Sequence, residues 1–399
     1  MAVVSPGAAA NVECDWREDA GMTAEIDTWL EGVAGAWHDQ AKEFLFLLLP
    51  VFSTQSRLYW PYLLATAVIA VALFAFRDRR DTFGVRGFFG YAIPKRLYLN
   101  WSAVLDYKFY AVNGIFEIFV KIGTMTFSGV LAADGLAALL TQLLGTGPAL
   151  EVSWTARLVY SVGWFIGMDL GFFIGHYFTH RVPILWEFHK VHHAAEVLTP
   201  ITNFRNHPVE TAFMGLVMGV PTGLVTGVAV YRYGISPVGV TLLGAGLMTF
   251  FFSITGNLRH SHFWLSYGPA VSKYLCSPAM HQIHHSNAQM HWDTNIALYF
   301  SLWDRMTGTI YIPDEMEALD WGLGAGEHKE YNGLWALYAL PFRKAWRLLA
   351  QPVDRDFVAR VLWRPQDQWS RRRLAARARG WAARPRENPA PGERDAAVP

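Results

Sequence analysis

The stretch "DLGFFIGHYFTHRVPILWEFHKVHH", residues 169–193, places five histidines at the end of an apolar run. Within "HYFTH" and "HKVHH", the later histidines follow the first at a distance of three or four residues. On an α-helix, residues at these distances share one face, with side chains about 5 to 6 Å apart. Each group can therefore direct its imidazoles into one volume, as a chelating metal site requires.

A third group, "HQIHH" at residues 281–285, repeats the same spacing. A lone histidine such as His328 is more often a structural residue, but eight that share helical faces argue for a common role. Neutral imidazole is a good ligand for iron, copper or zinc. The eight candidate ligands are His176, His180, His189, His192, His193, His281, His284 and His285.

The composition of the chain points to a membrane protein. Of its 399 residues, 52% are hydrophobic and only 17% are charged, whereas soluble domains carry about a quarter charged residues. The formal net charge of +1 gives no indication of a nucleic-acid partner. The two cysteines, Cys14 and Cys276, lie far apart, so neither a disulfide framework nor a thiolate metal site is indicated.

Several apolar stretches approach the roughly 20 residues that cross a bilayer. We predict spans at 58–76 and 158–178, one span plus a shorter interfacial helix within 109–144, and a helical hairpin formed by 211–230 and 238–254. The basic "RDRR" after the first span should be cytoplasmic. An even number of spans between the second and third groups would bring all the histidines to that same face.

These features predict an all-α fold: an integral membrane helical bundle with a cytoplasmic histidine-rich helical cap. The N-terminal segment lacks the pattern of a cleavable signal peptide. From Val353 onward, eleven arginines stand against six acids, which indicates a disordered tail near anionic headgroups or a plain solvated tail. The predicted regions are an N-terminal segment at 1–57, a transmembrane region at 58–156, a histidine-cluster core at 157–313, an extension of the cap at 314–352 and the basic tail at 353–399.

The run at 169–193, the element "NFRNHPVE", and "SPAMHQIHHS" leading to "SLWDRMTGTIY" resemble the fatty acid hydroxylase and sterol desaturase superfamily. The resemblance covers Arg157 to about Pro313. It implies two iron ions held by the eight histidines, with His207 and His260 as an additional pair. The "HSH" that contains His262 departs from the more usual "HSN", so the role of His262 stays open. Zinc could occupy such a site in purified protein.

The resemblance also implies a reaction that uses O2 and two electrons to attack a C–H bond of a lipid from the bilayer. The substrate class stays open between sterol or hopanoid, fatty acyl lipid and carotenoid, as does hydroxylation against desaturation. The sequence has no HPGG, no cysteine run and no GxGxxG. A separate electron donor, such as a ferredoxin, cytochrome b5 or a reductase, is therefore expected.

Ligand imidazoles usually donate their second N–H to a carboxylate or a carbonyl. Four acids near the motifs are candidates for this role: Asp169, Glu210, Asp293 and Asp304. Asp169 lies seven residues before His176, and an acid inside a span is a functional candidate by default. Glu117 is also in an apolar stretch, but no motif connects it to the site.

Two other classes of protein remain as alternatives. A metal transporter would place its ligands near the bilayer midplane within inverted repeats, and the sequence shows no internal repeat. A membrane zinc hydrolase would typically carry HExxH, which is absent.

Overall fold

The computed structural model describes residues 51, 56–77, 84–147, 150–236, 239–243 and 245–352, without the side chains of 115–119. The chain divides into two compact units, Met1–Tyr59 and Trp60–Pro399. All of the described helices and strands lie in the second unit. The predicted N-terminal segment falls almost wholly outside the described residues. The basic tail and the side chain of Glu117 lie outside them too.

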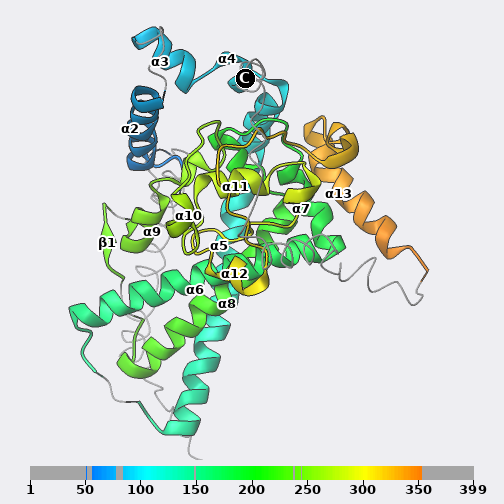
Figure 1. The fold of residues 1–399 in the computed structure, drawn as a ribbon. Helices are drawn as coiled ribbons and strands as arrows, with labels where there is room; N and C mark the ends of the chain where they lie inside the picture. The colour runs from blue at the N-terminus through cyan, green and yellow to red at the C-terminus, as the bar shows by residue number, and fades with distance from the viewer. Residues whose placement is uncertain are drawn as a thin grey trace, which may run out of the picture. The chain divides into compact units, whose positions relative to one another are not determined.

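The second unit is mostly helical, with one two-residue antiparallel ladder in which Thr241 pairs with Gly246 (Figure 1). Its elements are α2 (Trp60–Arg77), α3 (Val85–Ala92), α4 (Lys95–Tyr98), α5 (Trp101–Leu144), α6 (Trp154–Arg181), α7 (Pro183–His193), η1 (Pro200–Phe204), α8 (Pro208–Tyr233), β1 (Thr241–Leu242), β2 (Ala245–Gly246), α9 (Leu247–Ser253), η2 (Gly256–Leu258), α10 (Gly268–Ser272), α11 (Pro278–His284), η3 (Gln289–His291), α12 (Leu302–Thr307), η4 (Gly324–Glu330) and α13 (Leu334–Leu349).

Among the described residues, three helices are long and apolar enough to cross a membrane: Val120–Leu144 within α5, α6 and α8. The spans predicted at 158–178 and 211–230 are therefore present as α6 and α8. The span predicted at 58–76 is present as a helix, α2. Its apolar part, Trp60–Phe76, is shorter than the three long helices.

The prediction for residues 109–144 is wrong in one respect. Instead of a span and a separate interfacial helix, the structure has one continuous 44-residue helix, α5. Its start is fixed by Asn100, whose side chain accepts a hydrogen bond from the amide of Ser102. An isolated glycine costs a helix only about 1 kcal/mol, so the glycines in this stretch, without a proline, do not break it.

The second half of the predicted hairpin, 238–254, is not a span. Residues 241–246 contain the short ladder of β1 and β2, and the helix α9 has only seven residues. The sequence places glycines at 239, 244 and 246, and Leu243 takes a positive φ of 50°. Such a concentration of glycine favours a turn over a helix. The chain therefore returns from α8 to the histidines without a second full-length helix.

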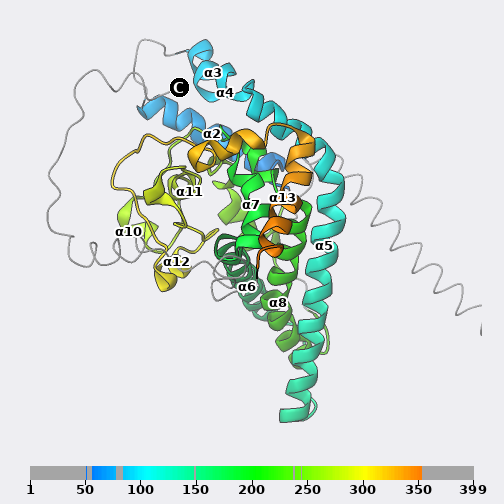
Figure 2. The ribbon, with the colours of Figure 1, turned by 90° about the vertical axis from the view of Figure 1, so that its right-hand side faces the viewer.

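Glycine at every fourth position explains how closely the three spans pack. The series are Gly163, Gly167, Gly171 and Gly175 on α6, and Gly215, Gly219, Gly223 and Gly227 on α8. A Cβ at Gly171 would lie 2.7 Å from the Cα of Met218, and one at Gly219 would collide with Ser128 of α5. Small residues at such intervals let helix backbones approach closely in a membrane. α8 therefore lies directly against both α5 and α6 (Figures 1 and 2).

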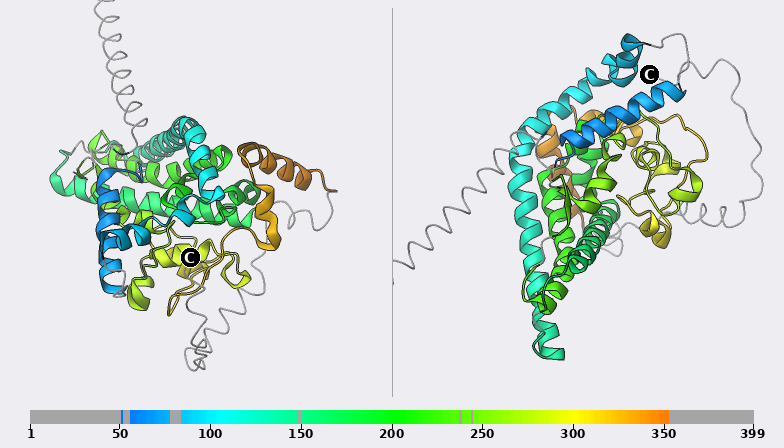
Figure 3. Two further views of the ribbon diagram at one scale, coloured as in Figure 1. Left: turned by 90° about the horizontal axis from the view of Figure 1, so that it is seen from above. Right: turned by 90° about the vertical axis from the view of Figure 1, so that its left-hand side faces the viewer.

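The end of the bundle where α6 stops and α8 begins carries the short helices of the histidine-rich region (Figure 2). α7 follows α6 after a single residue and packs against α13, and a buried apolar cluster that includes Phe109, Val191 and Leu337 joins α5, α7 and α13. α13 lies at the edge of this unit, with one side turned away from the other helices (Figures 1 and 3). The placement of this region on the cytoplasmic side stays a prediction.

Candidate metal centre

Four segments of the chain bring nine histidines together, and local sequence signals fix the starts of two of them, α7 and α11. α6 supplies His176 and His180 from its last turns. Pro183 occupies the first turn of α7, where its missing N–H is tolerated, and α7 supplies His189, His192 and His193. Ser277 caps α11 by accepting from the amide of Met280, and His281, His284 and His285 follow. His260 comes from the turn after η2.

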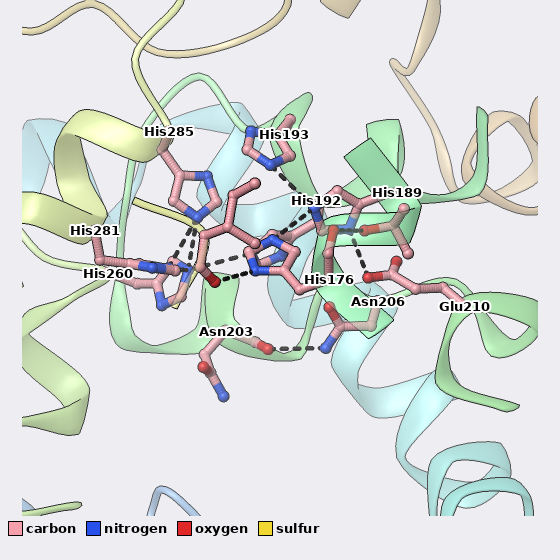
Figure 4. A network of polar contacts seen from close by, with 12 residues as sticks. His176, His189, His192, His193, Asn203, Asn206, Glu210, His260, His281 and His285 are labelled. Carbon is pink, nitrogen blue, oxygen red and sulfur yellow. Dashed lines mark hydrogen bonds and ion pairs between the residues drawn. The ribbon is translucent and has the colours of Figure 1, made fainter. Parts of the chain in front are cut away.

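The nine imidazoles form two buried groups. Figure 4 labels those other than His180 and His284. One group holds five residues: His176, His180, His189, His193 and His284. The other holds four: His192, His260, His281 and His285. Both α7 and α11 contribute to each group, and the rings of His193 and His285 stack with centroids 4.6 Å apart. The two groups are therefore neighbours in one continuous cluster.

The hydrogen-bond pattern of the five-histidine group fits a bound cation. The Nδ1 of His176 lies 2.6 Å from the carbonyl oxygen of Ile296, so it must carry the hydrogen, and the Nε2 of this neutral ring is left as a lone pair. The Nδ1 of His189 lies 2.6 Å from Glu210, and an ionised Glu210 would likewise keep the hydrogen on that nitrogen. The Nε2 atoms of these two rings nevertheless face each other at 3.1 Å. Two lone pairs cannot form a hydrogen bond, whereas a metal ion satisfies both.

Distances in the four-histidine group agree with the same interpretation. The Nε2 of His260 lies 3.3 Å from that of His192, 3.0 Å from that of His285 and 3.2 Å from that of His281. With metal–nitrogen bonds of about 2.0–2.1 Å, nitrogens at neighbouring coordination positions are roughly 2.9–3.4 Å apart. The donor set, nitrogen without thiolate, suits iron, copper or zinc.

Burial keeps these rings in the state that binds metal. It lowers the pKa of His189 to about 3 and that of His284 to about 3. Burial also holds the pKa of His192 and of His285 well below the usual range, with neighbouring imidazoles adding to the effect. These four rings are therefore neutral lone-pair donors near pH 7.

Two of the four predicted carboxylates contact candidate ligands directly. Glu210 accepts from Nδ1 of His189, as Figure 4 shows, and Asp293 lies 3.2 Å from Nδ1 of His180. Asp293 also accepts from Nη1 of Arg181 at 3.4 Å. These contacts fix the orientation of two rings of the five-histidine group.

Asp169 and Asp304 act one step further out than predicted. Asp169 accepts from the amides of Tyr299 and Phe300 and from the indole of Trp303. Asp304 accepts from the amides of residues 296 and 297. Both carboxylate oxygens of Asp169 accept hydrogen bonds from this loop, and Asp169 contacts none of the nine rings. The expectation that it orients a ligand is therefore wrong.

The loop that these two acids hold supplies ligand supports that sequence reasoning missed. The carbonyls of Ile296 and Thr294 accept from Nδ1 of His176 and His284, the latter at 2.7 Å. Asp293 and Asn295 take positive φ values of 55° and 52°, which Asp and Asn tolerate better than most residues. Backbone carbonyls leave no trace in a residue pattern, although "DTN" is a signal for such a turn.

The structure does not bring His207 or His262 to either group. His207 is the N-cap of α8: its Nδ1 accepts from the amide of Val209, and its Nε2 donates to the carbonyl of Tyr338. Both nitrogens are therefore engaged, and the expectation of a tenth ligand is not supported by this geometry. His262 donates from Nε2 to the carbonyl of Tyr91 at 2.7 Å. This hydrogen bond connects α3 to the segment that also carries His260 of the metal centre.

A buried ion pair behind α7 is a second feature that the sequence analysis missed. Arg205 donates from Nη1 to Asp106 at 2.7 Å, and both side chains are about 1% exposed. The Nε of Arg205 donates to the carbonyl of Val191, which lies between two ligands of α7. Asp106 also accepts from Thr202. This pair fixes the last turn of α7 relative to α5.

We expect Glu210→Gln to lower metal affinity by about 10- to 100-fold, the usual cost of losing a partner of a ligand histidine. The amide is a weaker acceptor than the carboxylate, so the ring of His189 is less basic and less well oriented. Resistance to a chelator during titration measures the loss. Glu196→Gln is the control, since Glu196 lies 3.8 Å from His328 and away from both groups. Unchanged resistance in Glu210→Gln would contradict the role.

Asp169→Leu should behave differently, because it removes the acceptor of three N–H groups in a buried loop. Each unsatisfied donor costs about 1–3 kcal/mol, so a marked fall in the thermal midpoint of the purified protein is expected. Asp169→Asn keeps one acceptor oxygen and should fall between wild type and Asp169→Leu. A wild-type midpoint for Asp169→Leu would show that the loop does not depend on this carboxylate.

Residues 161–309 match the family model described as fatty acid hydroxylase. The chain is 26% identical over 184 residues to ornithine lipid hydroxylase OlsE of Rhizobium tropici, covering 45% of this chain and 49% of that protein. It is 28% identical over 166 residues to alkylglycerol monooxygenase of Danio rerio, covering 40% and 32% of the two chains. It is 27% identical over 143 residues to cholesterol 25-hydroxylase of Homo sapiens, covering 36% and 47%.

The chain thus spans about half or less of the length of these curated relatives. No solved structure matches it. The matched residues 161–309 contain all nine histidines of the two groups, from His176 to His285. The histidine-cluster core of this chain therefore lies in the part that matches the fatty acid hydroxylase family.

Proposed function

We propose that this protein is a membrane oxygenase that hydroxylates a C–H bond of a lipid with O2 at a pair of iron ions. The single observation that carries the proposal is the pair of adjacent buried histidine groups, five and four residues, inside the fatty acid hydroxylase core. The relatives named above are lipid hydroxylases and monooxygenases, which supports hydroxylation over desaturation.

Bound iron would supply the redox chemistry that activates O2. The protein itself would hold the ions through nine neutral imidazoles and orient the rings through acceptors on their second nitrogens. In the five-histidine group these acceptors are Glu210, Asp293 and the carbonyls of Thr294 and Ile296. The overall reaction consumes a lipid C–H bond, O2, two electrons and two protons, and yields a lipid hydroxyl group and water.

The lipid would reach the centre from the bilayer. At the interfaces of α8 with α5 and with α6, the helix backbones are in close contact along the glycine series. Neither interface therefore leaves room for an acyl chain. Electrons would come from a separate donor, because the sequence carries no flavin, haem or iron–sulfur motif.

The test is to compare the lipids of cells with and without the protein under labelled O2. The expected result is a lipid that gains one hydroxyl group with a labelled oxygen atom. A lipid that gains a double bond and no oxygen would change the reaction to desaturation. Unchanged lipids in cells whose purified protein carries two irons would overturn the proposed activity, and metal transport would then need an assay of its own.

The proposed cytoplasmic position of the centre gives a separate prediction about sidedness. Single cysteines at Glu196 and Gln289, in a chain without Cys14 and Cys276, should react with impermeant thiol reagents only after lysis. A cysteine at Glu151, at the opposite end of α6, should react in intact cells. Labelling of Glu196→Cys and Gln289→Cys from different sides would contradict the common face.

A further inference from the structure

Helix α13 is apolar on two opposite faces: the inner face is packed, and the outer face is largely exposed, with Phe342 at its edge also contacting α7 and α8. Its inner face buries Leu337, Leu340, Pro341 and Ala345 against the rest of the second unit. The outer face exposes four large apolar side chains at intervals of seven, four and three residues, which keeps them in one stripe. They are Trp335, 81% exposed, Phe342, 54%, Trp346, 70%, and Leu349, 48%.

The height of α13 along the bundle is fixed by contacts with the start of a span. The carbonyl of Tyr338 accepts from Nε2 of His207 at 3.2 Å, and the ring of Phe342 lies 5.3 Å from that of His207. His207 is the N-cap of α8, one of the three helices able to cross a membrane. α13 therefore lies at the level where α8 would enter the bilayer, alongside the upper part of α5 in Figure 2.

The exposed charged residues of α13 are both positive and lie on one flank of the helix. Arg343 and Arg347 are exposed and follow Phe342 and Trp346 by one residue each. Lys344 points the other way and is bound to Glu327 at 2.6 Å. The helix sequence contains no Asp or Glu. Its outer side thus combines tryptophan, phenylalanine and leucine with arginine, the composition of helices that lie in a membrane interface.

We propose that α13 lies in the headgroup layer of the membrane, with its outer stripe against the upper acyl chains and its two arginines against lipid phosphates. The inference rests on α8 crossing a membrane and not on the proposed reaction. Trp335 begins the stripe and Trp346 lies one turn before its end at Leu349; tryptophans are likewise enriched in the aromatic belts at the ends of spans. A stripe of this kind exposed to water would be an aggregation-prone patch.

The consequence for the metal centre is a fixed position relative to the bilayer. The ring of Phe342 in α13 packs against the ring of Phe188 in α7, with the ring centroids 5.2 Å apart. It is also linked through Lys344 and Glu327 to Lys190, which lies between ligands of α7. An interfacial α13 would thereby hold the ligand helix α7 next to the lipid phase that supplies the substrate.

The experiment measures the depth of an environment-sensitive fluorophore on the full chain in nanodiscs of phosphatidylcholine with phosphatidylglycerol. It is attached to Trp346→Cys, or to the control Asn332→Cys, which is exposed just before α13, in a chain without Cys14 and Cys276. We expect Trp346→Cys to be quenched by lipids spin-labelled near the headgroup and several-fold less than the control by aqueous iodide. Iodide quenching equal to the control would overturn the proposal.

A label at Trp346→Cys that is shielded from both quenchers would also overturn it, because the stripe would then be covered by protein, such as a second copy. The role of the arginines is tested with Arg343→Gln combined with Arg347→Gln. Removing phosphatidylglycerol should increase iodide quenching in the parent chain and have no such effect in the double variant. Equal responses of the two proteins would contradict the phosphate contacts. Equal thermal midpoints show that the variants are folded.

Discussion

His284→Ala is expected to remove metal from the five-histidine group and to lower lipid oxidation by more than about 100-fold, since losing only an outer partner of a ligand costs about 10- to 100-fold. The Nε2 of His284 is buried without a hydrogen-bond partner, and its Nδ1 is held by the carbonyl of Thr294. Its only evident role is therefore to donate a lone pair into the group. The protein should remain in the membrane, because His284 lies outside the three long spans.

The matching substitution in the other group is His192→Ala. It should reduce the metal content from about two ions per chain toward one while leaving the five-histidine group loaded. Metal analysis of protein from iron-replete cells measures both variants. His328→Ala is the control, because His328 binds the carbonyl of Leu323 and lies outside both groups. Full metal content in both ligand variants would refute the proposed centre.

Much of this centre was predictable from spacing alone, and the reasons are local. Histidines three or four residues apart converge wherever their segment is helical, and α6, α7 and α11 are helices. His207 shows the limit of such reasoning. A histidine directly before proline at the start of a helix can be a ligand or a helix cap, and the residue pattern of "NHPVE" is the same in both cases.

The partners of the ligands were only half predictable. Glu210 contacts a ligand because it follows the cap of α8 by three residues, a position that sequence can indicate. Asp169 was expected to do the same from its position on α6, but its partners come from residues 299–303, about 130 positions away. A pairing at that distance depends on tertiary packing, which a single sequence does not reveal.

The fold was predictable where hydrophobic length decides and less so where glycine does. α6 and α8 follow from apolar runs. Glycine has a different effect in each segment: it favours a turn within 238–254, is tolerated in α5 and is needed for close packing in α8. The difference lies in what each glycine meets. Gly219 allows the backbone of α5 to approach, so its cost in helix propensity is offset by close packing.

Asp106→Ala is expected to destabilise the protein by about 3–5 kcal/mol, the cost of leaving a buried charge without its partner. Arg205 is 1% exposed and would keep its charge in the buried region beside Val191. The fall in thermal midpoint of the purified protein measures the effect. Glu330→Ala is the control: Glu330 is half exposed and 3.3 Å from Lys344, and such a surface pair contributes at most about 1 kcal/mol.

The double variant Asp106→Leu with Arg205→Met separates stability from the support of the ligands. Replacing both charges by apolar side chains of similar size removes the uncompensated charge, so most of the midpoint should return. The carbonyl of Val191 is one of the last four of α7 and would still lack the N–H that Arg205 donates. We therefore expect the double variant to be stable but to lose metal to a chelator faster than wild type. Wild-type chelator resistance would show that the pair stabilises the fold without positioning His192 and His193.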